Sequence, residues 1–222
     1  MPDTLIDAVS NSETGQHMSG FAIAPGTVTN NIDMIMEGRV QVKISARPSF
    51  EPWARLPSIG GASGRGFMWV PQIDDEVLVA FAENDASSAY VLGGLWSTLS
   101  SPPLSTPNDT LAKKVIKTGL TEALGHKIEF DDAEQSITIT TSTQQKINMD
   151  PTTIELTNLA GTVSVKLDNT EQKVSITAVS KIELSALEIS LNAEAALDLS
   201  GATVSINATG PCQVQGLPIQ LN

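Results

Sequence analysis

The feature that most constrains this chain is a series of short alternating apolar segments that fills residues 131–222. In each segment, two or three Ile, Leu, Val or Met residues alternate with polar or small residues. Neighbouring side chains of a β-strand point to opposite faces, so each segment predicts a short strand with one narrow apolar stripe. The alternating sets are Ile137/Ile139, Ile147/Met149, Ile154/Leu156, Val163/Val165/Leu167, Val174/Ile176, Ile182/Leu184, Leu187/Ile189/Leu191, Leu197/Leu199 and Val204/Ile206.

The spacing of these segments predicts a ladder of very short strands. From Lys181 onward the sets recur roughly every seven or eight residues. The parity of the apolar positions changes between Leu184 and Leu187, and again between Leu199 and Val204. A change of parity moves the stripe to the other face of a strand, so a turn residue or a bulge must absorb each change.

A stripe this narrow cannot close a hydrophobic core within one chain. Ordering the backbone loses conformational entropy at every residue, and only burial of the stripe by other chains can offset that loss. Three chains wound into a prism would turn every stripe toward a common axis and would leave no lateral strand edge unpaired. Residues 131–222 contain no aromatic side chain, which suits a narrow axis. The sequence therefore predicts a homotrimer.

The N-terminal part follows a different construction rule. All nine aromatic residues lie at or before Phe130, and all four arginines lie in the first third of the chain. Short alternating segments predict about five strands, which together favour a small closed barrel. Three prolines set among serines and threonines then predict a linker. The expected strands begin at Gly26–Val28 and continue with Val40–Ile44, Phe67–Val70, Glu76–Phe81 and Ala89–Leu92, and the linker prolines are Pro102, Pro103 and Pro107.

The overall charge excludes several partners. The chain has 13 Lys and Arg against 25 Asp and Glu, a formal net charge of −12. Such an excess repels nucleic-acid phosphates and anionic lipid surfaces, so neither is an expected partner. Cys212 is the only cysteine, the chain begins without a basic and apolar leader, and no apolar run approaches a membrane span. Synthesis in the cytoplasm is therefore expected.

The candidate catalytic and ligand-binding groups do not converge in the sequence. Acidic residues occur as doublets beside turns at Asp74–Glu76, Glu83–Asp85 and Asp131–Asp132, which indicates solvated turns rather than a cation site. His17 and His126 have no neighbouring nucleophile, and Gly64-Arg65-Gly66 lacks the residues of a phosphate-binding loop. No catalytic, cofactor-binding or metal-binding residue is expected, and the chain is not expected to be an enzyme.

Several motifs of the N-terminal part resemble one protein family. They are Gly26-Thr27-Val28 with Gly38-Arg39-Val40-Gln41-Val42, Trp53-Ala54-Arg55, Gly64-Arg65-Gly66-Phe67-Met68-Trp69-Val70-Pro71, Asp75-Glu76-Val77-Leu78-Val79-Ala80-Phe81, Asp85, and Tyr90-Val91-Leu92-Gly93-Gly94-Leu95-Trp96. In this order they resemble the central spike proteins of contractile tails. That family includes phage baseplate assembly protein V, the VgrG spikes of type VI secretion and the spikes of extracellular injection systems. Gly125–Asp132 also resembles the family's transition into its needle.

The resemblance implies an all-β fold, with a small OB-fold barrel followed by an intertwined trimeric β-helix, or β-prism, needle. The expected organisation is a flexible N-terminal arm (1–19), the barrel (20–99), a linker leading into the needle (100–130) and the spike (131–222). It also implies a place at the tip of a contractile tail or injection particle, where the spike nucleates baseplate assembly and pierces the target envelope mechanically.

Departures from the family refine the expected partners. Only about 25 residues precede Gly26, so the hub domain of VgrG proteins is absent and a separate hub protein is expected. The interval between barrel and needle has no room for a lysozyme domain, and the histidine pair of an iron-bound tip is missing. Gly216, Leu217, Pro218, Ile219 and Leu221 instead predict a blunt apolar tip. The ending resembles spikes that are capped by a PAAR-type protein.

Two other functions remain open at this point. A trimeric tail fibre or adhesin would also need a stalk of short strands, but it would normally end in a receptor-binding head with exposed aromatic residues. A glycan-degrading β-helix would need paired carboxylates in a groove, and the ladder is short for that purpose. The favoured interpretation is a structural spike.

Overall fold

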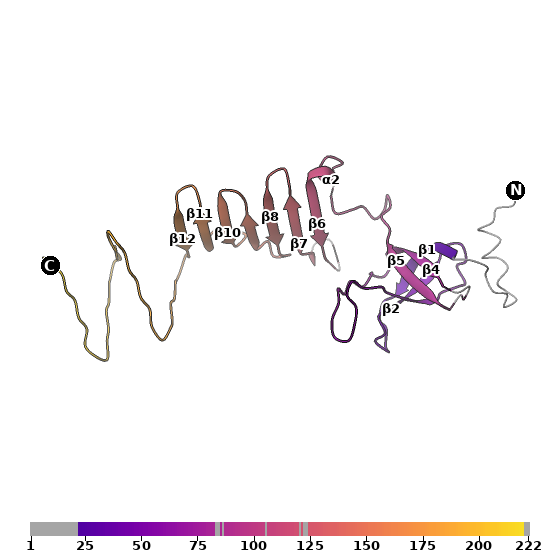
Figure 1. The fold of residues 1–222 in the computed structure, drawn as a ribbon, viewed down its shortest axis with the longest axis horizontal. Coiled ribbons are helices and arrows are strands. Elements are labelled where there is room, and N and C mark those ends of the chain that lie inside the picture. Colours follow the sequence, from indigo (N-terminus) through magenta and orange to yellow (C-terminus); the bar gives the residue numbers. More distant parts are fainter. Residues whose placement is uncertain are drawn as a thin grey trace. The chain divides into compact units, whose positions relative to one another are not determined.

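The computed structural model describes residues 22–82, 85, 87–104, 106–119, 121 and 124–219 of the 222-residue chain. Figure 1 shows a β-barrel, a separate sheet of consecutive strands and a C-terminal segment that changes direction repeatedly. The expected N-terminal arm, residues 1–19, lies outside the described residues. Apart from the short helix α2 (Asp109–Ala112), the regular elements of these described residues are strands.

The N-terminal strands close into a barrel. They are β1 (Ala22–Asn30), β2 (Arg39–Ile44), β3 (Trp53–Arg55), β4 (Glu76–Phe81) and β5 (Ala89–Gly94), and their order around the barrel is β1-β2-β3-β5-β4. All neighbours are antiparallel except β3 and β5, which run parallel and close the barrel. Closure leaves no unpaired lateral edge. The expected closed barrel is confirmed.

The barrel core is built from inward-facing β-branched residues. Val28, Val40, Val42, Val77 and Val79 are fully buried, and in β2 and β4 the buried residues alternate strictly with more exposed ones. Branched side chains pack well on a pleated surface, which is why these alternating segments form strands here. The other members of the same core are Ala24, Ile44, Ala54, Phe81, Ala89 and Val91.

One predicted strand is wrong. Residues Phe67–Val70 form no strand, and the third strand of the barrel is Trp53–Arg55 instead. The rings of Phe67 and Trp69 stack on each other, with centroids 5.8 Å apart, and both stay about half exposed. The segment has no strand pairing, although Val70 is partly buried against the barrel core, and Pro71, which lacks a backbone donor, follows it.

Gly26 occupies a position where the barrel tolerates no side chain. A Cβ at this position would lie 2.6 Å from Val42 Cγ1 and 2.8 Å from the Lys43 carbonyl oxygen. We expect Gly26→Ala to destabilise the barrel by about 1–3 kcal/mol through overpacking. Urea unfolding followed by tryptophan fluorescence measures this, because all three tryptophans precede residue 100. Gly93→Ala is the matched control, since a Cβ there meets nothing within 4 Å.

The second element is a seven-stranded antiparallel sheet in which each strand pairs with the next along the chain. Its strands are β6 (Lys113–Lys117), β7 (Lys127–Asp131), β8 (Ser136–Thr140), β9 (Lys146–Met149), β10 (Thr153–Thr157), β11 (Ser164–Asp168) and β12 (Lys173–Thr177). β6 and all but the last residue of β7 fall within residues 100–130, the segment expected to be the linker leading into the needle. β6 gave a weak sequence signal because three of its five residues are lysines.

Two hairpins of the sheet repeat the same turn. The β7–β8 turn begins at Asp131, whose Oδ1 accepts hydrogen bonds from the backbone N–H groups of the residues two and three further on. Asp168 does the same in the β11–β12 turn. Gln135 and Gln172 close the two turns with φ near +52°, a region that few non-glycine residues adopt. Residues 130–139 and 167–176 are therefore a structural repeat.

Candidate functional site

One face of the seven-stranded sheet consists almost entirely of apolar side chains. The strand pairing places two continuous rows on this face, and thirteen of the fourteen residues in them are apolar. One row is Ile116–Ile128–Ile139–Ile147–Leu156–Val165–Ile176, and the other is Lys114–Phe130–Ile137–Met149–Ile154–Leu167–Val174. We call this surface the apolar face. Strand alternation predicted the members of both rows from Ile137 and Ile139 onward, but not the first two members of each row, which lie in β6 and β7.

The apolar face is more exposed than the polar face behind it. In β10, Ile154 and Leu156 are 41% and 52% exposed, whereas Thr153, Glu155 and Thr157 on the opposite face are only half-buried. β11 has the same inverted pattern. A sheet in water normally covers its apolar side and exposes its polar side. An apolar surface of this extent marks an interaction site.

Polar side chains on the opposite face satisfy one another across the strands. Thr138 Oγ1 donates to Asn148 Oδ1 at 2.8 Å, and Asn148 Nδ2 donates to Asp150 at 2.9 Å. Lys166 Nζ lies 3.1 Å from Asp168. Among the described side chains, no buried nitrogen or oxygen atom lacks a hydrogen-bond partner. This face is therefore complete in the single chain, whereas the apolar face is not.

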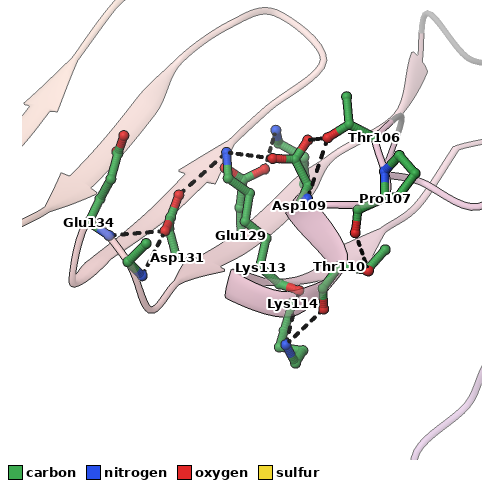
Figure 2. A network of polar contacts seen from close by, with 11 residues as sticks. Thr106, Pro107, Asp109, Thr110, Lys113, Lys114, Glu129, Asp131 and Glu134 are labelled. Carbon is green, nitrogen blue, oxygen red and sulfur yellow. Dashed lines mark hydrogen bonds and ion pairs between the residues drawn. The ribbon is translucent and has the colours of Figure 1, made fainter.

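A polar network holds the first strands of the sheet to helix α2 (Figure 2). Lys113 Nζ lies 3.4 Å from Asp131, 3.6 Å from Glu129 and 4.0 Å from Asp109. Asp131 is the only buried polar side chain of the described residues. Thr106 Oγ1 donates to Asp109 Oδ2 beside it. The network joins the end of the linker to β6 and β7, and it fixes where the sheet begins.

The carboxylates that close the hairpin turns have lowered pKa values. The backbone N–H of Glu134 and the ammonium of Lys113 lower the pKa of Asp131, and the backbone N–H of Glu171 and Lys166 lower that of Asp168. The hydroxyl and backbone N–H groups of Thr152 and Thr153 lower the pKa of Asp150. All three turns lie at the same end of the hairpins.

We expect the sheet to lose stability on acidification. A carboxylate whose pKa is lowered by folding stabilises the fold above its unfolded value, near 4, and this contribution disappears as the pH falls through the folded value. Urea midpoints measured between pH 7 and pH 2 by circular dichroism test this expectation. Asp168→Asn should flatten the pH dependence, whereas Asp132→Asn, a change at an exposed residue, should leave it in place.

The described part of the C-terminal segment forms no strand within this chain. Its described part, residues 180–219, constitutes a second compact unit in which the backbone is extended and bends at regular intervals. The bends fall at 179–180, 187, 194–195, 202, 209–210 and 217–218, so they recur every seven or eight residues. This is the spacing predicted from the apolar sets. Leu184, Leu191 and Val204 are each more than half exposed.

The predicted tip residues are apolar and open to solvent in the single chain. Leu217 is fully exposed and Ile219 is 49% exposed. Gly216 precedes Leu217 and Pro218 lies between Leu217 and Ile219 in the same segment. Leu221 lies outside the described residues.

The other candidate groups of the sequence do not converge. Gly64 and Gly66 flank Arg65 in a tight turn, in which Ala62 and Arg65 exchange backbone hydrogen bonds. His126 lies at the start of β7, where its Nδ1 accepts a hydrogen bond from the Ser142 backbone N–H. Within the described part of the chain, no group of three His, Cys, Asp or Glu residues is placed to hold a metal ion. No described helix has the length and apolar character needed to cross a membrane.

Comparison with protein families identifies the barrel. A comparison with curated proteins finds no match. Residues 24–96 match the family model described as the type VI secretion system/phage-baseplate injector OB domain. This segment spans β1 to β5 and carries all the barrel motifs identified in the sequence. The match supports a structural role of the baseplate-spike type in a phage or secretion-system tail. Residues 24–96, a third of the chain, are thus similar to the OB domain of the type VI secretion and phage-baseplate injector family, and this match supports the predicted resemblance to baseplate spike proteins.

Proposed function

We propose that this chain is the central spike of a contractile injection system or phage tail, and that it acts structurally, without catalysis. The observation that carries the proposal is the apolar face, which follows a segment that matches an injector OB domain and stays largely exposed among the residues that the structure describes. The spike would nucleate baseplate assembly at the end of the tail tube. It would pierce the target envelope mechanically, without binding lipid or nucleic acid.

The working form of the spike would be a homotrimer. Three sheets placed round an axis would each contribute one face of a prism, with the two apolar rows inside and the polar rows outside. Strands of four or five residues are short enough for three such faces to meet at a narrow axis. The segment 180–219 would continue the prism by pairing with its counterparts in the other two chains, which accounts for extended backbone without strand pairing of its own.

Measurement of the mass in solution tests this proposal directly. We expect light scattering or sedimentation equilibrium to give three times 23.4 kDa at micromolar concentration. A folded monomer would contradict the proposal, and a mass of two chains would replace the prism with a pair of facing sheets. Electron microscopy of the assembled particle would then test whether the chain lies on the tail axis below the tube.

Two further proteins complete the proposed assembly. A separate hub protein would connect the barrel to the tail tube. A PAAR-type protein would cover Gly216, Leu217, Pro218, Ile219 and Leu221, because three copies of an open apolar end exposed to water would promote association. These five residues form the proposed tip surface.

We expect deletion of residues 216–222 to abolish binding of the PAAR-type protein while the trimer remains intact. The apolar face lies entirely upstream of the deletion, so the mass in solution should not change. Pull-down with the PAAR candidate of the same system is the measurement. A single substitution, Leu217→Ser, is the milder companion variant, because Leu217 is the most exposed tip residue described. Unchanged pull-down with the deletion would show that the tip closes on itself.

A further inference from the structure

The two ends of the barrel differ sharply in chemistry. β1, β3 and β5 run in one direction and β2 and β4 in the other, so segments 31–38 and 56–75 and the chain leaving β5 all lie at one end. We call this the exit end. Asn31 Nδ2 donates to the Pro71 carbonyl oxygen at 3.1 Å, and the Leu95 N–H donates to Glu76 at 2.8 Å, which ties these segments together.

Exposed apolar side chains gather at the exit end. Segments 31–38, 56–75 and 95–99 contain eleven large apolar side chains that are each at least 47% exposed, among them Met34, Ile35, Met36, Phe67, Met68 and Trp69. At the opposite end, the described residues of 45–52 and 82–88 contain none. Single exposed apolar residues are ordinary on a protein surface, but eleven at one end of a small barrel indicate an interface.

The exit end is preformed. The side chain of Asp33, which is 9% exposed, accepts hydrogen bonds from the backbone N–H groups of Ile35 and Glu37 and pairs with Arg39 at 3.1 Å. Arg39 in turn lies over the Trp53 ring, with its guanidinium carbon 5.5 Å from the ring centroid. This bracing holds the methionines of segment 31–38 outward. A preformed surface loses less conformational entropy on binding than a loose one.

We propose that the exit end is a second self-association surface, covered by the exit ends of other copies of this chain. The inference rests on the proposed trimer. Only residues 95–108 separate β5 from α2, so each exit end is tethered within about 50 Å of the first sheet strand of its own chain. Once three sheets have joined, their exit ends share a small volume, and even modest contacts become intramolecular and effective.

The two main segments of the exit end can contact each other between copies. Segment 31–38 presents two methionines, whereas segment 56–75 presents the stacked rings of Phe67 and Trp69. Methionine sulfur packs favourably against aromatic rings, and its flexible side chain fits irregular surfaces. A contact between two different patches of neighbouring copies is heterologous, the kind of interface that closes into a ring of three. Arg39 pairs with both Asp33 and Glu37 within each copy, which reduces the charge of this group to −1 per copy.

Cross-linking of the full chain tests the inference. In a Cys212→Ser background, the pair Met36→Cys and Trp69→Cys should form covalent trimers with a short bifunctional maleimide. The matched pair Ser49→Cys and Ser87→Cys, which is exposed at the opposite end, should not. The single variant Met36→Cys should also react about tenfold more slowly than Ser49→Cys with a bulky maleimide, because a covered thiol is less accessible.

The outcomes separate this inference from the proposed function. A trimeric mass with cross-linked exit ends supports both. A trimeric mass without cross-linking, and with Met36→Cys as reactive as Ser49→Cys, would overturn the second interface but would not contradict the trimeric spike. The exit end would then be available to a different protein. A monomeric mass would overturn both.

Discussion

Replacing Leu156 with aspartate is expected to convert the proposed trimer into monomers. Leu156 lies in the central part of the apolar face, on β10, and it is 52% exposed in the single chain. In the proposed prism, three symmetry-related carboxylates would face the axis without a partner. An uncompensated buried charge costs about 3–5 kcal/mol. Because the trimer would bury three such charges, we expect this cost to exceed the free energy of association.

The neighbouring residue supplies a control for this experiment. Thr157 follows Leu156 on β10 but points to the polar face, between Lys146 and Ser164 of the adjacent strands. Thr157→Asp should therefore leave the mass in solution unchanged. Sedimentation of both variants at the same concentration makes the comparison. If Leu156→Asp sedimented as a trimer like the wild-type protein, the apolar face would not be the interface.

Backbone amides of residues 182–206 are expected to exchange slowly with deuterium in the assembled protein. In the single chain these residues form no strand, so an isolated copy should exchange them at nearly the rate of an unfolded peptide. In the proposed trimer, hydrogen bonds to the other two copies would slow this exchange by several orders of magnitude, since opening then requires separation of three chains.

Hydrogen exchange read by mass spectrometry also provides an internal comparison. The Leu156→Asp variant should lose protection in residues 182–206 but keep it in the barrel strands, whose hydrogen bonds lie within one chain. Fast exchange of residues 182–206 in the wild-type protein would mean that this segment has no partner strand. Protection of these residues in a monomeric variant would mean that the segment folds on its own.

Most of the architecture could be predicted because its signal is local. The period of two in β2, β4 and β8 to β12 follows directly from strand geometry, and the valines of the barrel mark its core. The family motifs then identified the OB domain. Prediction failed for Phe67–Val70, where a β-prone run of aromatic and aliphatic residues lies outside any ladder. Propensity reports which residues suit a strand, whereas strand formation depends on a partner that the sequence does not reveal.

The exit end of the barrel was missed for a related reason. Its residues come from three separate segments, and only strand direction brings them to one end. The inverted burial of the two sheet faces was equally inaccessible, because it appears only when both faces are compared in three dimensions. The repeated turn at Asp131 and Asp168 did have a sequence signal. Residues 130–139 and 167–176 share the order apolar-Asp-x-x-Glu-Gln at the same spacing.

The regular bends of residues 179–218 restrict how such a spike can change in length. The positions Ile182, Ile189, Leu197, Val204 and Cys212, each followed two residues later by another apolar residue, are alternately seven and eight residues apart, so the pattern repeats every fifteen residues. Inserting one residue would shift the later apolar positions by one relative to the bends, and within a strand a shift of one residue moves side chains to the opposite face. Whole units of fifteen residues preserve both the bends and the faces. Related spikes should therefore differ in length in discrete steps, and a designer could lengthen this one by duplicating residues 188–202.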